Sequence, residues 1–166
     1  MKNELHGDGV VNRHRIYLAS SWRNERQPEL VQTLRANGHE VYDFRNPEPG
    51  DTGFSWRQID ERWQSWNATQ QIAALDHPIA QHGLGLDYGG MKWASACVML
   101  QACGRSAALE LGWAIGAGKL TAVLMADGQE PELMIRLADL LTASVDDLLS
   151  WLDATSHWRQ PFIGES

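Results

Sequence analysis

Four short strand-type runs, separated by segments with helical spacing, are the feature that most limits how this chain can fold. They are RIYLA at 15–19, HEVYDF at 39–44, ASACVMLQAC at 94–103 and LTAVLMA at 120–126. Apolar runs of this length are typical of strands buried on both faces. Strands that alternate with helices indicate an α/β fold. We therefore predict a flavodoxin- or Rossmann-like, mostly parallel sheet that is flanked by helices.

The helices are expected where apolar residues recur at steps of three and four. Gly38 and Gly118 are well placed to end two of them in the left-handed conformation, and Pro78 suits the first turn of another. The tryptophans at 56, 63 and 66 fall on one face of a further predicted helix. The predicted helical segments are 22–37, 55–66, 78–93, 106–117, 131–141 and 144–154.

The chain has 166 residues, a length that suits one domain with an adequate core. We assign residues 14–154 to the α/β domain. Residues 1–13 read as a polar N-terminal tail, and 155–166 as a C-terminal tail with apolar residues at its tip. The N-terminal sequence lacks the apolar stretch of a secretory signal. The run at 120–126 is too short to span a bilayer.

Charge and composition narrow the possible partners. The net charge is -7, which argues against a nucleic-acid polymer because such partners require a basic surface. One small nucleotide held by one or two arginines stays compatible with this charge. The two cysteines, Cys97 and Cys103, have no zinc-type spacing, and the six histidines are scattered. We predict a cytoplasmic protein with no metal, no cofactor and no membrane partner.

Glu110 is an isolated carboxylate on an otherwise apolar predicted helix, in the segment CGRSAALELGWAIGAGKL at 103–120. Its neighbours at helical distance, Ser106, Ala107 and Ala114, do not form a solvated face. The helix dipole favours an acid in the first turns by about 0.3–1 kcal/mol, which offers a purely structural reason for it. A carboxylate among apolar side chains is more often retained for function. Glu110 is therefore the first candidate for a catalytic group.

The GRS triplet before this helix suggests an anion site. Gly104 permits a tight turn from strand to helix, and Ser106 is the predicted N-cap. Free N–H groups at a helix start bind anions, and Arg105 can reach a phosphate or a carboxylate. The alternatives are a surface arginine and a serine that serves only as a cap.

Other candidates follow from where parallel strands end. Ligands of open α/β sheets bind beyond the carboxyl ends of the strands. After the first strand these positions carry Ser20, Ser21, Trp22 and Arg23, and after the second strand Asp43. We interpret them as substrate-binding candidates, with Trp22 as the aromatic residue best placed to stack on a base and Asp43 as a reserve acid.

The run RIYLASSW, the pattern Asp87-x-x-x-Met91, the segment GRSAALELGWAIGAGK and the run TAVLM together resemble the nucleoside 2-deoxyribosyltransferase-like superfamily. This group includes deoxyribosyltransferases and nucleotide N-glycosidases, and it is similar in architecture to TIR domains that cleave NAD. The resemblance spans roughly residues 15–126. The GRS loop is more similar to the nucleotide hydrolase branch, because the transferases place an Asp where this chain has Gly104.

The resemblance implies that the protein cleaves the N-glycosidic bond of a nucleoside or nucleoside 5′-monophosphate, by hydrolysis or by transfer. Glu110 would be the nucleophile, Asp87 the acid that handles the base, and Ser106 the contact to the sugar or the 5′-phosphate. Asp87 could equally be a solvated acid on a glycine-rich helix. Two further functions stay open, namely TIR-like NAD cleavage and a nucleotide-binding sensor without turnover.

The apolar content of the predicted helix 55–66 and of Trp158 and Phe162 in the C-terminal tail exceeds what one small domain must bury. Apolar surface in excess favours self-association. We therefore predict a homo-oligomer, most simply a dimer.

Overall fold

The computed structural model describes residues 12–130 and 132–156. Within them, a five-stranded sheet has the order β2-β1-β3-β4-β5, and every neighbouring pair is parallel. This order is that of flavodoxin-like folds. The predicted fold class is confirmed. The strands are β1 (Arg15–Ala19), β2 (Glu40–Tyr42), β3 (Ala96–Leu100), β4 (Leu120–Leu124) and β5 (Leu140–Thr142).

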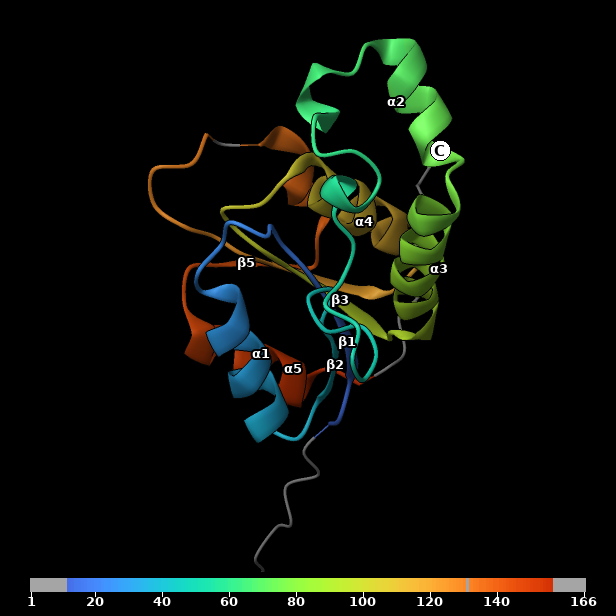
Figure 1. Ribbon diagram of the computed structural model, residues 1–166. Helices are drawn as coiled ribbons and strands as arrows, with labels where there is room; N and C mark the ends of the chain where they lie inside the picture. Colours follow the sequence, from blue (N-terminus) through green and yellow to red (C-terminus); the bar gives the residue numbers. More distant parts are fainter. Residues whose placement is uncertain (1–11, 131, 157–166) are drawn as a thin grey trace, which may run out of the picture.

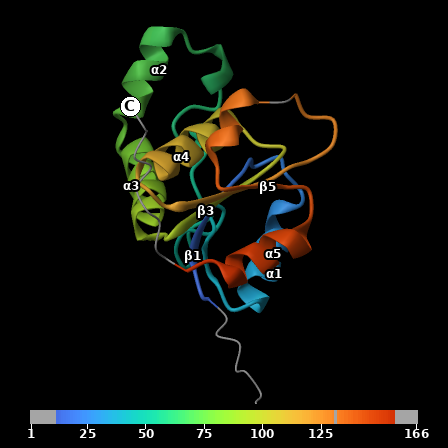
Figure 2. The same ribbon diagram turned by 180° about the vertical axis from the view of Figure 1, so that it is seen from behind.

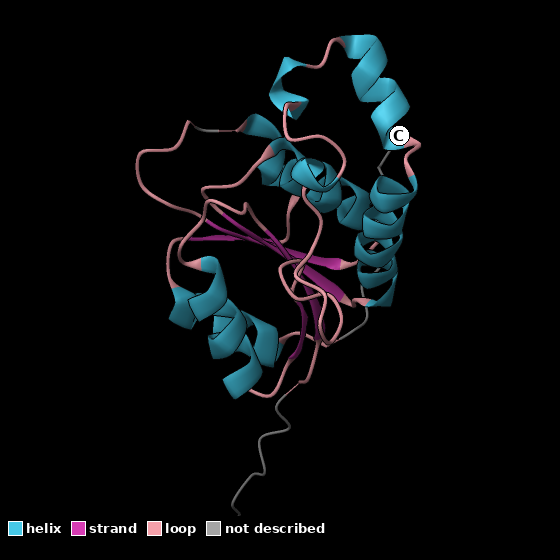
Figure 3. Ribbon diagram, viewed as in Figure 1, coloured by secondary structure: helices cyan, strands magenta, loops and turns pink. Residues whose placement is uncertain are grey.

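Helices cover both faces of the sheet (Figures 1 and 3). On one face α1 (Gln27–Ala36) and α5 (Val145–Ala154) pack on a core that includes Ile16, Leu18 and Val98. On the other face lie α3 (Pro78–Trp93) and α4 (Arg105–Gly116), as the reverse view also shows (Figure 2). None of the described helices is long and apolar enough to cross a membrane.

The alternation of side chains along β1 assigns residues to these two faces. Ile16 and Leu18 belong to the core under α1 and α5, whereas Tyr17 and Ala19 belong to the core under α4. An aliphatic strand thus presents one aromatic hydroxyl group to the face that α3 and α4 cover. The candidate acids lie on this same face.

Several predicted elements differ from the observed ones. The segment 55–66 is not one helix but two short 3-10 helices, η1 (Trp56–Gln58) and η2 (Trp63–Ser65), and helix α2 (Ala68–Leu75) was not predicted. The segment 131–141 holds a 3-10 helix, η3 (Leu133–Leu137), and then strand β5, not an amphipathic helix. β5 forms because its backbone pairs with β4, an interaction that local spacing does not encode.

Helix boundaries follow the predicted signals more closely. Gly38 and Gly118 have φ of 87° and 70°, the left-handed conformation expected just after α1 and α4. Pro78 is the first residue of α3. Helix α1 begins at Gln27, later than the predicted 22, because a turn precedes it. The first eleven residues and residues 157–166, which include Trp158 and Phe162, lie outside the described part, so the tail assignments stay predictions.

Candidate active site

Glu110 is half-buried on the face of α4 that packs against the sheet, in line with Ala107 and Ala114. Burial raises the pKa of its carboxyl group to about 7, and the negative charge of Asp87 adds to this increase. A hydrogen-bonding interaction with the Tyr17 hydroxyl opposes the increase by stabilising the carboxylate. The group therefore changes its charge close to neutral pH.

Asp87 is half-buried on α3 and accepts a hydrogen bond on Oδ1 from the Tyr42 hydroxyl at 3.0 Å. Burial raises the pKa of Asp87, the Tyr42 hydrogen bond opposes this, and the charge of Asp51 raises the pKa further. Tyr42 can approach the helix because residue 90 is glycine. A Cβ atom at Gly90 would lie 2.6 Å from the Tyr42 ring.

Two stacked tyrosines join these acids. The rings of Tyr17 and Tyr42 lie 5.3 Å apart with an interplanar angle of 10°. Burial raises the pKa of both hydroxyl groups; the charges of Glu110 and Asp87 raise that of Tyr17 further, and the charge of Asp87 raises that of Tyr42. Both hydroxyls therefore stay protonated at neutral pH and act as hydrogen-bond donors. Neither tyrosine was predicted as a site residue, although a tyrosine inside the aliphatic run RIYLA was a visible signal.

The larger cavity near these acids lies between the loop after β2 and helix α3, and we call it the loop–helix pocket. Its empty volume is about 400 Å³, which includes the open mouth. Asp87 is the predicted site residue that lines it. The loop contributes Phe44, Pro47, Asp51, Gly53, Phe54 and Gln58, and the helix contributes Ile79, His82, Gly83, Leu86 and Asp87.

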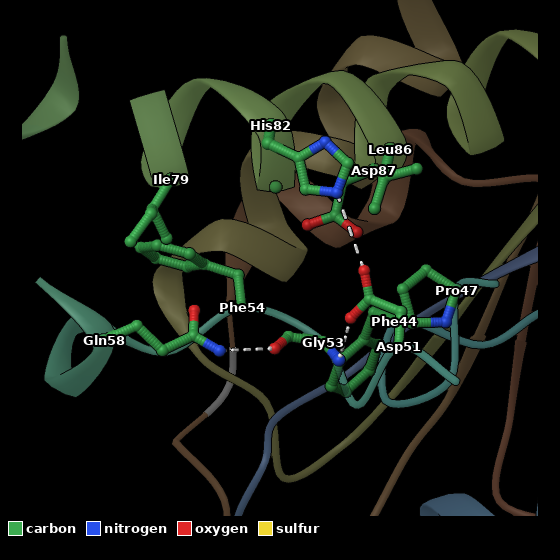
Figure 4. A pocket seen from close by; sticks show the side chains of 11 residues that line it. Phe44, Pro47, Asp51, Gly53, Phe54, Gln58, Ile79, His82, Leu86 and Asp87 are labelled. Carbon is green, nitrogen blue, oxygen red and sulfur yellow. Dashed lines mark hydrogen bonds and ion pairs between the residues drawn. The ribbon is translucent and has the colours of Figure 1, made fainter. Parts of the chain in front are cut away.

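Figure 4 shows the polar side chains of this pocket. His82 points from α3 toward Asp51 on the loop, with 3.7 Å between His82 Nε2 and Asp51 Oδ2. Asp51 Oδ1 accepts a hydrogen bond from the main-chain N–H of Gly53 at 2.7 Å. Gln58 lies beside the loop and forms a capping box with Ser55. No sequence motif marked the Asp51–His82 pair, because its members are 31 positions apart and on different elements.

Glu110 itself lines a narrow gap under α4 that has no room for a water-sized molecule. Its other lining side chains include Tyr17, Cys97, Trp113 and Lys119. Lys119 donates hydrogen bonds to main-chain carbonyl groups, and burial lowers the pKa of its ammonium group. Asp87 thus lines the loop–helix pocket and Glu110 lines the gap under α4, while the charge of Asp87 raises the pKa of Glu110.

Asp43, the reserve acid, is buried and its carboxylate is held by internal hydrogen bonds. It accepts them from the side chain of Gln27 at 2.8 Å, the main chain of Arg45 at 3.0 Å and the side chain of Asn46 at 2.9 Å. The Arg45 guanidinium donates in turn to the carbonyl group of Ser21 at 3.1 Å. This network holds the loops after β1 and β2 together, and it leaves Asp43 a structural role in the described site.

The residues predicted after β1 do not line the loop–helix pocket. The Ser20 hydroxyl donates to the main-chain carbonyl of Leu100 at 3.0 Å, which joins the ends of β1 and β3. Trp22 is 51% exposed and meets Phe44 edge to face at 5.3 Å. Arg23 is exposed.

The GRS triplet is arranged differently from the prediction. Gly104, not Ser106, is the N-cap of α4, with an extended backbone at φ −90° and ψ 178°. Arg105 is already helical, so Ser106 falls inside the first turn. No side chain caps this end of the helix, and all three residues are exposed. The prediction of Ser106 as the N-cap is wrong, because the chain turns into the helix earlier, at the glycine.

No protein-family model matches the chain, and no curated protein matches its sequence. Among solved structures, the chain is similar to the CMP N-glycosidase BcmB of Clostridium botulinum. The sequence identity is 18% and the TM-score is 0.45, over 85% of this chain and 98% of that chain. A likeness at this level does not bear on function.

Proposed function

We propose that this protein cleaves the N-glycosidic bond of a nucleoside or nucleoside 5′-monophosphate, with Glu110 as the nucleophile and Asp87 as the acid. The observation that supports this most is a pair of half-buried carboxyl groups on one face of the sheet, in which the charge of Asp87 raises the pKa of Glu110. Glycosidic bond cleavage typically uses two carboxyl groups, one that donates a proton and one that is ionised.

The two groups would divide the chemistry as follows. The bond from C1′ to the base nitrogen breaks, and its electron pair leaves with the base, which takes a proton from the Asp87 carboxyl group. Glu110 stabilises the positive charge that develops at C1′ and forms an ester with that carbon. Water, activated by the Asp87 carboxylate, then hydrolyses the ester. A second base in place of water would give transfer instead.

The hydroxyl groups of Tyr17 and Tyr42 would determine which carboxyl oxygen atoms carry a proton. Tyr17 donates toward Glu110 and favours the ionised form that attacks. Tyr42 occupies Oδ1 of Asp87 at 3.0 Å, so Oδ2 is the atom left to carry the proton for the departing base. None of the described residues donates a hydrogen bond to Oδ2 of Asp87.

The exposed start of α4 is the proposed contact for a 5′-phosphate. Its first main-chain N–H groups are not capped by a side chain, and Arg105 lies beside them. Arg105→Ala should raise the KM for a 5′-monophosphate about tenfold and leave the KM for the corresponding nucleoside nearly unchanged. Equal losses for both substrates would contradict the phosphate contact.

The first experiment is a base-release assay with ribonucleosides, deoxyribonucleosides, their 5′-monophosphates and NAD, with and without a second base as acceptor. We expect Glu110→Gln to lower the rate by about a thousandfold or more. Asp146→Asn removes an exposed acid from α5, on the opposite face of the sheet, and should keep wild-type activity. Release of no base from any compound would contradict the proposal, and release from NAD alone would replace it with NAD cleavage.

A further inference from the structure

The loop–helix pocket has the walls of a site for a flat aromatic ring. Phe44 and Phe54 come from the loop after β2, and Ile79 and Leu86 come from α3. Phe54 is seated against α3 at Gly83, where a Cβ atom would lie 2.8 Å from the Phe54 side chain. Apolar walls with a few polar groups are typical of pockets that hold small organic ligands.

Asp87 connects this pocket to the proposed chemistry. It lines the pocket, and its charge also acts on Glu110. A base that receives a proton from Asp87 must lie on the pocket side of that residue, while the sugar lies on the side of Glu110. The lining of the pocket is therefore expected to select the base.

The polar atoms of the pocket select for hydrogen-bond donors. The carboxylate of Asp51 is an acceptor, and the lining contains no lysine or arginine. Gln58 is engaged in its capping box, so its amide is already used. A phosphate group is disfavoured here by the carboxylate of Asp51, which assigns the pocket to the base end of a nucleotide.

Asp51 is the acceptor best held in place. Its Oδ1 atom is fixed by the Gly53 N–H at 2.7 Å. Its Oδ2 atom lies 3.7 Å from His82 Nε2, which is longer than a hydrogen bond and leaves the oxygen available to a ligand. Because one oxygen is anchored by the main chain, the other has a defined direction.

We propose that the loop–helix pocket binds a nucleobase that carries an exocyclic amino group, and that Asp51 Oδ2 accepts a hydrogen bond from this group. A carbonyl group at the same ring position would face the carboxylate with an oxygen and be repelled. Asp51 is thus the residue that separates amino bases from their carbonyl counterparts. This inference rests on the proposed function for its assignment of the base end, but it concerns binding, which is measured without turnover.

The test measures binding by calorimetry to the Glu110→Gln protein, so that no ligand is consumed. Two ligand pairs differ only in an amino or carbonyl group: cytidine with uridine, and adenosine with inosine, each also as the 5′-monophosphate. We expect the amino member of at least one pair to bind about tenfold more tightly.

Asp51→Asn, added to Glu110→Gln, gives the sharper result. The Gly53 N–H requires an oxygen acceptor, so the Asn amide oxygen takes that place and its NH₂ group faces the pocket. The pocket then offers a hydrogen-bond donor in place of the carboxylate. The ratio of the affinity for the amino member to that for the carbonyl member should fall to about one or below one. Asp146→Asn in the same background, an exposed acid of α5, should leave the ratio unchanged. Circular dichroism checks that each variant is folded.

The inference is overturned if the carbonyl members bind as tightly or more tightly, if Asp51→Asn leaves the ratio unchanged, or if none of the ligands binds. Its failure is separable from failure of the proposed function. Selective binding without base release by the wild type supports the amino-base pocket and contradicts the glycosidase. Base release with no preference for amino bases supports the glycosidase and contradicts the amino-base pocket.

Discussion

Glu110 is a carboxyl group whose folded environment favours the protonated form. Its pKa is raised from 4.5 to about 7 by burial and by the charge of Asp87. Between these two pH values the folded chain binds a proton that the unfolded chain has lost. The free energy of unfolding therefore falls as the pH rises through this window, and the loss persists at higher pH. A carboxyl group kept at such a cost is typical of sites that trade stability for activity.

We expect Glu110→Gln to stabilise the protein at pH 8 by about 1–3 kcal/mol, because it replaces the buried charge with a neutral amide of the same shape. At pH 4.5 the gain should vanish, since the wild-type carboxyl group is then protonated in the folded state. Urea unfolding at both pH values measures this. Glu25→Gln, at an exposed position, is the control and should change little at either pH. Destabilisation by Glu110→Gln at pH 8 would show that the ionised group is held by favourable contacts.

His39 should give the opposite dependence on pH. It is buried, and its Nδ1 accepts a hydrogen bond from the main-chain N–H of His14 at 3.2 Å. Burial lowers the pKa of His39, and the charge of His14 lowers it further, although Asp153 opposes this. The unfolded chain therefore binds more protons below about pH 6.5, and stability falls as the pH falls through that value.

His39→Asn retains an acceptor for the His14 N–H and removes the ionisable ring. We expect the loss of thermal stability between pH 7 and pH 5 to be smaller in this variant than in the wild type. Thermal unfolding across this range gives both slopes, and equal slopes for His39→Asn and the wild type would contradict the assignment.

At the scale of elements, the close contact of α3 with β2 depends on one glycine. The Tyr42 ring lies where a side chain at position 90 would begin. Gly90→Ala should cost about 1–3 kcal/mol and displace Tyr42 from Asp87. Gly89→Ala is the matched control on the same helix, because a Cβ there meets nothing within 4 Å. It should be neutral or stabilise by up to about 1 kcal/mol, since alanine favours helices. Chemical denaturation compares the two, and equal effects would contradict the contact.

Elements with strong local signals were predictable from sequence. Strands β1 and β4 lie inside the predicted runs, and α3 has the predicted bounds at Pro78 and Trp93. Their apolar patterns coincide with the burial that the fold requires, so local and tertiary preferences agree.

The segment 55–66 was not predictable in this way, because its tryptophans pack on one another. Trp56 meets Phe54 at 4.8 Å and Trp66 at 5.7 Å, both edge to face, and the Trp66 indole donates to Asp60 at 2.8 Å. These contacts close short turns in place of a continuous helix. Spacing of three and four identified the residues that cluster, but not the backbone that brings them together.

Some residues of the candidate site were likewise predicted from the sequence, and others were missed. Glu110 was chosen from the sequence because an acid in an apolar helix is a local anomaly, whereas Asp87 was chosen from the family resemblance. Tyr42 and Asp51 were missed because their roles depend on distances to α3 that only the tertiary structure sets. Residues after β1 and β3 were chosen by the general rule for parallel sheets, and the pocket lies instead beside the loop after β2.

At the scale of the whole molecule, large apolar side chains remain exposed on α2 and α3. Ile72, Leu75 and Leu84 are 66%, 55% and 60% exposed, and Tyr88 is 42% exposed. Exposed apolar side chains gathered on neighbouring helices are typical of interaction surfaces, and the net charge of -7 opposes non-specific association. We therefore expect the predicted homo-oligomer to form through contacts between α2 and α3 of neighbouring copies.

Light scattering after size exclusion should give a mass of about twice the 18.6 kDa of one chain. The double variant Ile72→Glu and Leu84→Glu should return the mass to that of a monomer, because two carboxylates cannot be buried in an apolar interface without partners. Leu133→Glu, at an 86% exposed position on η3, is the control and should keep the wild-type mass. A monomeric wild type would contradict self-association. A dimer that survives the double variant would place the interface on another face, since α2 and α3 would then stay exposed in the assembly.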